Sequence, residues 1–153
     1  MSKLELKIIP PLVTLICGAL MWGVSLVTAQ MALLLPFKNM LAILFLALGL
    51  LLMFIAAFSF FKAKTTINPL HPEKSSSLVT GGLYRFSRNP IYLADLLFLV
   101  AWGFFLGNLF SLLLIIGFVL YMNRFQIFVE ERMLEKTFGD EYLAFKAKVR
   151  RWF

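Results

Sequence analysis

Long apolar runs alternate with short polar breaks along the chain. The runs cover residues 11–35, 40–61, 91–106 and 109–128. A helix needs about 20 apolar residues to cross a bilayer, so the first two runs are long enough and the third is short for a full crossing. The pattern predicts an all-α fold: an integral membrane bundle of four transmembrane helices.

The polar breaks indicate how the helices are connected. Residues 36–39 interrupt the apolar pattern after the first run, and Gly107 and Asn108 separate the third run from the fourth. A connection of two residues requires antiparallel neighbours. The sequence therefore predicts two helical hairpins, one at each end of the chain.

Residues 65–88 form the long polar connection between the hairpins. Pro69 and Pro72 exclude a regular helix there, and long irregular loops in compact domains are more often functional than not. We expect a single domain over residues 1–153, with an N-terminal hairpin over 1–64. The remaining part, 65–153, holds a cytoplasmic loop, the second hairpin and a C-terminal amphipathic helix.

Composition and charge agree with a membrane protein. Hydrophobic residues make up 61% of the chain, against about half in soluble domains. The net charge is +7, but the basic residues flank apolar runs and form no groove-sized face, so we expect no nucleic-acid partner. With four spans only Lys38 falls on one side, which predicts that both termini are cytoplasmic. The other side receives the basic tail and Lys3, Lys7, Lys62, Lys64, Lys74, Arg85 and Arg88.

A polar stretch over residues 78–92 precedes the third run. Gly81 and Gly82 lie near its start and Arg85 and Arg88 follow. Asn89 can cap a helix, and Pro90 suits the first helical turn. This order predicts a turn, a polar arm and a helix start. Free N–H groups at a helix start beside arginines favour an anionic or strongly polar ligand.

A second polar region follows the fourth run. Helical spacing places on one face Asn123, Gln126 and Glu130, and on another Arg124, Phe128 and Glu131. We therefore expect one glutamate to point into a site and the other to pair with cations at its periphery. From residue 124 we expect the helix to emerge from the membrane and to break at Gly139. The amphipathic tail beyond it suits either a helix lying on anionic headgroups or a ligand contact, and its apolar positions are Leu143, Phe145 and Trp152.

The order of these motifs resembles a known family. Gly-x-Tyr-x-x-x-Arg-Asn-Pro-x-Tyr over 82–92, a hydrophobic hairpin, Glu-Glu, Phe-Gly-x-Glu-Tyr over 138–142 and a final Arg-Trp follow one another. This order is similar to that of the isoprenylcysteine carboxyl methyltransferase and phospholipid methyltransferase family of integral membrane enzymes, from about residue 65 to 152. The resemblance implies methyl transfer from S-adenosylmethionine to a lipophilic small molecule or lipid at the cytoplasmic membrane interface.

The resemblance also implies site residues. Cofactor binding is carried over to Ser76, Ser77, Leu78, Val79, Tyr84, Asn89, Pro90, Ile91, Tyr92 and Glu130. Many relatives have histidine where this chain has Asn89, and only histidine titrates near neutral pH. Proton transfer at that position is therefore not expected, and we expect no metal site.

The acceptor is less defined. Carboxyl methyltransferases of the family carry an arginine four residues before the cofactor glutamate, where this chain has Gln126, with Arg124 two residues away. Arg124 and Gln126 are candidate substrate-binding residues, and Arg88 and Arg124 are candidate catalytic residues. The departure leaves carboxylate, amine and thiol acceptors open. Asp95, one turn beyond Tyr92, is either a site carboxylate or an interface residue.

Other interpretations remain at this point. His71 is a candidate base, although a lone loop histidine is more often incidental. A sterol-type membrane reductase would have a similar C-terminal hairpin but would bind NADPH. A small membrane scaffold would need neither the polar loop nor the paired motifs.

Overall fold

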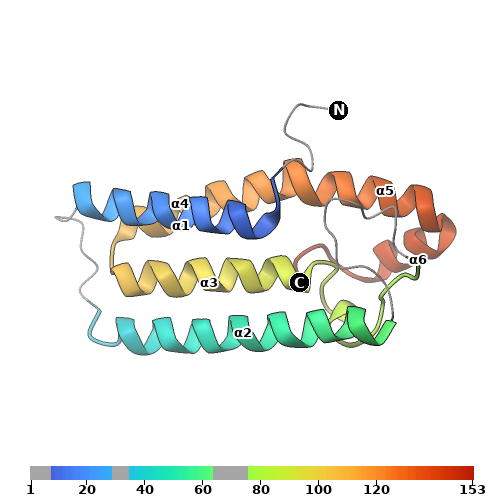
Figure 1. The fold of residues 1–153 in the computed structure, drawn as a ribbon, viewed down its shortest axis with the longest axis horizontal. Helices are drawn as coiled ribbons and strands as arrows, with labels where there is room; N and C mark the ends of the chain where they lie inside the picture. Colours follow the sequence, from blue (N-terminus) through green and yellow to red (C-terminus); the bar gives the residue numbers. More distant parts are fainter. Residues whose placement is uncertain (1–7, 29–34, 64–75) are drawn as a thin grey trace.

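The fold is a bundle of long helices lying side by side (Figure 1). The computed structural model describes residues 8–28, 35–63 and 76–153, and these residues form helices and connections without a β-strand. The all-α class is therefore confirmed for the described part. The helices are α1 (Pro10–Val27), α2 (Lys38–Ala63), η3 (Gly82–Arg85), α3 (Pro90–Leu106), α4 (Leu109–Tyr121), η4 (Met122–Ile127), α5 (Phe128–Phe138) and α6 (Asp140–Lys148).

Three helical stretches are long and apolar enough to cross a membrane. They are α1, α2 and the continuous helix Leu109–Phe138, whereas α3 has 17 residues and is shorter. The predicted second and third runs match α2 and α3 closely. The first run extends beyond α1, which ends at Val27, and residues 29–34 lie outside the described residues. The helix that follows the fourth run continues to Phe138 and stops at Gly139, as predicted.

Most apolar side chains on the outer helices face outward. On α2, for example, Phe54 is 71% exposed and Phe58 is 55% exposed. Water does not stabilise a surface of this extent and hydrophobicity, and such surfaces mark contact with a membrane. The chain is thus a membrane protein whose outer helix faces are solvated by lipid.

Helix α3 lies at the centre of the bundle, between α2 and the pair formed by α1 and α4 (Figure 1). The buried residues of α2 are all small and seven apart: Ala42, Gly49 and Ala56. A Cβ atom on Gly49 would lie 2.6 Å from the ring of Phe98 on α3. Small residues let helix backbones approach closely, so van der Waals contact holds α2 against α3.

Hydrogen bonds hold α1 against the α3–α4 hairpin. Trp102 Nε1 donates to Gly18 O at 3.0 Å, and the Ser111 hydroxyl donates to a carbonyl of α1 at 2.7 Å. Asn108 caps α4 by accepting from the Ser111 N–H, and its Nδ2 donates to Thr28 O at 2.8 Å. Lipid offers no partner for buried polar groups, so these bonds are the available way to satisfy them.

The helix after the hairpin contains a π-helical segment, η4, between α4 and α5. Its i→i+5 bonding changes the angle between successive side chains. The predicted common face of Arg124, Phe128 and Glu131 is therefore wrong: Arg124 and Phe128 are exposed and Glu131 is buried. Gln126 and Glu130 do lie together, as predicted, and are hydrogen-bonded.

The chain reverses after α5. Gly139 has φ of +52°, a left-handed conformation that favours glycine, and α6 then folds back beneath α5 (Figure 1). Phe145 of α6 packs inside the fold with Tyr84 and Tyr142, and Trp152 packs against the central core. The prediction of a tail lying on headgroups is wrong for Phe145 and Trp152.

Candidate functional site

A cavity of about 300 Å³ lies where α2, α3, α5 and α6 meet, a volume at the lower end of ordinary small-molecule sites. It is lined by Pro10, Pro11, Met53, Ala57, Phe60, Ser77, Leu78, Val79, Tyr84, Arg88, Asn89, Ile91, Tyr92, Asp95, Glu130, Glu131, Leu134, Tyr142 and Phe145. The cavity wall is thus largely apolar, with a few polar and charged side chains on it. All predicted cofactor residues except Ser76 and Pro90 line this cavity.

Glu130 is held in a defined orientation on the cavity wall. The Tyr92 hydroxyl donates to Glu130 Oε1 at 2.5 Å, and Gln126 Nε2 donates to the same oxygen at 2.5 Å. Tyr92 and Gln126 are both buried. Since both bonds use Oε1, the second carboxylate oxygen of Glu130 takes part in neither.

Glu131 lies between two arginines. Arg88 Nη2 donates to Glu131 Oε1 at 2.7 Å, and Arg151 donates from Nη2 to Oε2 at 2.6 Å and from Nε to Oε1 at 3.0 Å. The hydrogen bond to Glu131 raises the pKa of Arg151. The predicted pairing with cations is confirmed. The predicted peripheral position is wrong, because Glu131 is only 4% exposed.

Arg88 connects the polar arm to the segment after α6. Its Nη1 donates to the carbonyls of Lys146 and Val149, both at 3.0 Å, and its backbone N–H donates to Arg150 O at 2.9 Å. Together with the Glu131 bond, these contacts use both terminal nitrogens of the guanidinium. Its Nε is buried without a partner in the described part of the chain. Arg88 therefore lines the cavity and also holds the segment after α6 in place.

Asn89 occupies the N-cap position of α3, and Pro90 is the first helical residue, as predicted. However, the Asn89 side chain makes no capping bond: its Nδ2 donates to Arg151 O at 3.0 Å. The Ser87 hydroxyl donates to the same carbonyl at 3.3 Å. The predicted side-chain cap is therefore wrong, since Asn89 instead fixes the segment that carries Arg151.

Two tyrosines close the cavity on the side of η3 and α6. Tyr84 and Tyr142 are both buried, at 6% and 2% exposure. Burial raises the pKa of Tyr84, and the nearby Glu130 carboxylate raises it further. Burial is also the main cause that raises the pKa of Tyr142. Both hydroxyls therefore stay protonated and can donate hydrogen bonds to a ligand.

The remaining predicted residues lie elsewhere. Arg124 is exposed and its guanidinium lies 5.6 Å from the ring centre of Phe125, and neither Arg124 nor Gln126 lines the cavity. Gln126 contacts the site through Glu130. His71 falls outside the described residues.

Sequence reasoning missed several cavity residues. Pro10, Met53 and Phe60 come from the first two helices, whose uniform hydrophobicity gives no sign of which residues face a site. Tyr142 and Glu131 belong to motifs noted in the sequence, but their burial depends on how α6 folds back. Asp95 and Tyr92 do share one wall, as predicted.

Comparison with known proteins gives a consistent result. A family model described as phospholipid methyltransferase matches residues 37–141. A Haemophilus influenzae protein described as "Uncharacterized protein" is 53% identical over 62 residues, which are 40% of this chain and 98% of that protein. No solved structure gives a significant match. The family match spans α2 through the start of α6, and so covers most of the cavity wall.

Proposed function

The chain belongs to the phospholipid methyltransferase family, and we propose that it transfers a methyl group from S-adenosylmethionine to a lipophilic acceptor at the membrane surface. The observation that carries this proposal is the Glu130 carboxylate, which Tyr92 and Gln126 hold on one oxygen beside a cavity. A fixed carboxylate with a second oxygen uncommitted suits a ligand with positive charge and hydroxyl groups.

The cavity residues fit the chemistry of this cofactor. Glu130 would accept from its hydroxyl or ammonium groups, while Ser77 and Asn89 add polar contacts. Leu78 and Val79 supply an apolar wall suited to a purine ring. When bound, S-adenosylmethionine supplies an electrophilic methyl group on a sulfonium centre. The residues of the chain then have to bind the cofactor and the acceptor, orient them toward each other and exclude water.

Orientation depends on rigid supports around the site. Arg88 is fixed through four contacts and offers positive charge at the cavity wall, which suits a carboxylate on the cofactor or acceptor. We assign Arg88 this role. Arg124 lies outside the cavity and is not included in the proposed machinery.

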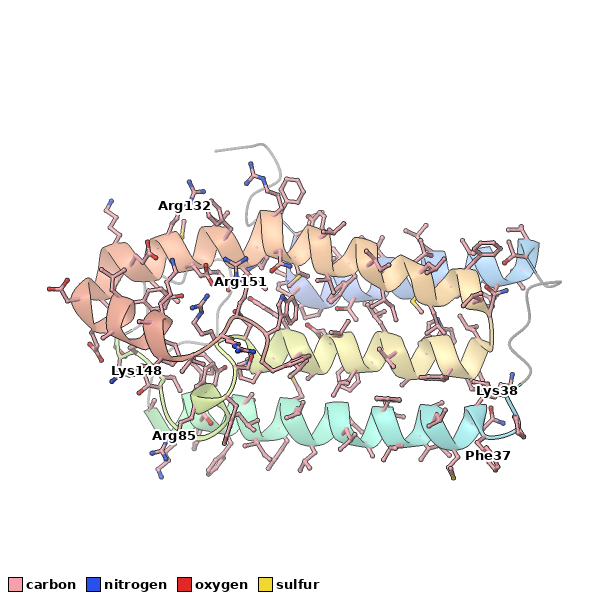
Figure 2. All side chains as sticks on the ribbon, turned by 180° about the vertical axis from the view of Figure 1, so that it is seen from behind. Phe37, Lys38, Arg85, Arg132, Lys148 and Arg151 are labelled. Carbon is pink, nitrogen blue, oxygen red and sulfur yellow. The ribbon has the colours of Figure 1, made fainter. Side chains whose placement is uncertain are left out.

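The acceptor would reach the cavity from the lipid. Pro10, Met53 and Ala57 bring apolar surface of α1 and α2 into the cavity wall, so an apolar tail would contact membrane-facing helices. Exclusion of water by these walls strengthens electrostatic contacts inside the site. Figure 2 shows Arg85, Arg132 and Lys148 toward one end of the bundle and Lys38 at the other, and we assign the arginine-rich end to the cytoplasm.

Ligand binding tests the proposal. The purified protein in nanodiscs is titrated by calorimetry with S-adenosylhomocysteine and, separately, with NADPH. The two titrations distinguish a methyltransferase from a reductase. We expect binding of S-adenosylhomocysteine, with at least a tenfold loss in Glu130→Gln and an unchanged affinity in Glu135→Gln. Glu135 is a suitable control because its carboxylate pairs with Lys146 and does not line the cavity. NADPH binding alone would favour a reductase, and binding of neither ligand would favour a scaffold.

A further inference from the structure

A groove of about 470 Å³ lies between α2 and α3, toward the end of the bundle away from the cavity. The residues that line it follow i, i+3, i+4, i+7 spacing, from Asn39 on α2 and from Phe98 on α3. Each helix thus contributes one face to the groove. None of these residues lines the cavity that holds Glu130, so the groove is a separate feature of the bundle.

The groove has the shape of a channel along the two helices. Ala42 and Ala101 line it and are buried, whereas Ile43 and Phe105 line it and are 67% and 56% exposed. Small buried side chains between large exposed ones leave a depression that faces the surrounding lipid. The lining positions on α2 extend over about 10 Å of helix axis. The hydrocarbon of one leaflet is about 15 Å thick, so the groove is long enough for most of one acyl chain.

A cation lies at the outer end of this groove. Lys38 is the first residue of α2 and precedes Asn39, which lines the groove. Its Nζ donates to Phe105 O at 3.4 Å, and a Cβ atom on Gly107 would lie 2.8 Å from the same nitrogen. This hydrogen bond uses one of the three ammonium protons, so the group can still donate to a ligand. The Lys38 ammonium therefore supplies positive charge at the mouth of an apolar channel.

Ending α3 does not require this lysine. Gly107 already closes that helix, because its N–H donates to Gly103 O and Phe104 O. Figure 2 shows Lys38 at one end of the bundle, with Arg85 and Lys148 toward the other. A cation at the end with few positive charges runs against the usual distribution of lysine and arginine. An anionic group bound beside the groove would account for its position.

We propose that the groove between α2 and α3 binds one anionic phospholipid from the leaflet at the Lys38 end. An acyl chain lies along the alanine floor, Lys38 binds the phosphate, and the exposed amide of Asn39 adds a donor. Neither part would suffice alone, since an apolar tail needs no cation and a free phosphate needs no apolar channel. This lipid is a bound partner of the α2–α3 contact, and its site is independent of the proposed function.

Tryptophan fluorescence tests the proposal, because Trp102 lines the groove and bromine atoms on an acyl chain quench a tryptophan that they contact. Trp22→Phe and Trp152→Phe together leave Trp102 as the single tryptophan. The protein is reconstituted in bilayers that contain brominated phosphatidylglycerol or brominated phosphatidylcholine in increasing fractions. We expect Trp102 to show about a fivefold preference for phosphatidylglycerol, the effect of one lysine near an anionic headgroup.

Variants at both ends of α2 identify the source of this preference. Lys38→Gln should abolish it, and Lys38→Arg should retain it. Lys62→Gln is the matched control, because Lys62 is an exposed cation in the last turn of the same helix and should not affect the preference. None of the three variants should change the affinity for S-adenosylhomocysteine. A preference that survives in Lys38→Gln would overturn the proposal.

Trp22 provides a second control that needs no change at Lys38. It is 54% exposed near the end of α1, and the bond from Asn108 Nδ2 to Thr28 O places the ends of α1 and of the α3–α4 hairpin together. In a protein that keeps Trp22 alone, the two brominated lipids should quench equally. The same preference at Trp22 as at Trp102 would assign the effect to lipid around the whole chain and overturn the proposal. Absence of quenching at Trp102 by either lipid would also overturn it, because a second copy or another segment would then cover the groove.

Discussion

Replacing Glu131 by glutamine should destabilise the fold far more than the same change at Glu135. The two glutamates lie one turn apart on α5, and each contacts a cation. The side chains of Arg88 and Glu131 are only 10% and 5% exposed, whereas those of Lys146 and Glu135 are 37% and 31% exposed. The comparison is therefore between a buried carboxylate held by two arginines and a more exposed carboxylate paired with one lysine.

The magnitude follows from this difference in exposure. Removing one partner of a buried ion pair costs about 3–5 kcal/mol, because the other charge stays buried and uncompensated. Arg151 is 32% exposed on its side chain, so water compensates part of its loss, and we expect about 3 kcal/mol for Glu131→Gln. Glu135→Gln should cost less than about 1 kcal/mol, as is usual for a solvent-screened pair.

Equilibrium unfolding by SDS in mixed micelles, followed by circular dichroism, measures both free energies of unfolding. A double-mutant cycle with Arg88→Met then isolates the pair, and we expect a coupling energy of about 2 kcal/mol. A loss in Glu131→Gln no larger than that in Glu135→Gln would refute the reasoning. It would mean that the two arginines find other partners when the carboxylate charge is removed.

Three further changes test other contacts. Arg88→Lys should lower the free energy of unfolding by about 1–3 kcal/mol in the same assay. Lysine cannot replace the planar guanidinium, which reaches two carbonyls and Glu131 together. Wild-type stability of this variant would indicate that Arg88 merely extends toward headgroups. Trp152→Phe should cost about 1 kcal/mol through loss of the Nε1 bond to Asn123, and an unchanged unfolding midpoint would count against that bond. A cysteine placed at the exposed Phe37 should react with a membrane-impermeant maleimide only from outside the cell, and labelling from the cytoplasmic side would reverse the assigned orientation.

The sequence predicted the helices well and their ends less well. Apolar length and the Gly107–Asn108 turn were enough for α2, α3 and the hairpin, because in lipid each backbone group must be bonded within its helix. The continuation of the fourth helix to a break at Gly139 was also predicted, because its polar last turns keep a helical spacing up to a glycine. The π-helical segment leaves no pattern that distinguishes it from a regular helix.

The sequence predicted the motifs that form the site but not how their side chains are arranged in space. Glu130 and Tyr92 were both named, yet their hydrogen bond joins residues 38 positions apart and depends on how the hairpin packs. The burial of Glu131 depends on α6 returning the segment with Arg151 to the bundle. Such long-range contacts follow from tertiary packing, which local spacing does not encode. Asp95 was visible as a carboxylate in an apolar run, but the lack of a hydrogen-bond partner for its buried Oδ2 in the described part of the chain was not.

The two ways in which the bundle is fastened have different mechanical consequences. Directional bonds tie α1 to the α3–α4 hairpin, whereas small residues place α2 against α3 through contact alone over most of its length. Sliding or tilting α2 would break dispersion contacts a little at a time, whereas moving α1 would leave several polar groups bare in hydrocarbon. Helices α1, α3 and α4 therefore form the rigid unit, and α2 is the helix that can move against it. Since α2 carries Met53, Ala57 and Phe60 of the cavity wall, under the proposed function its movement would give a lipid tail a path into the cavity and a product a path back to the bilayer.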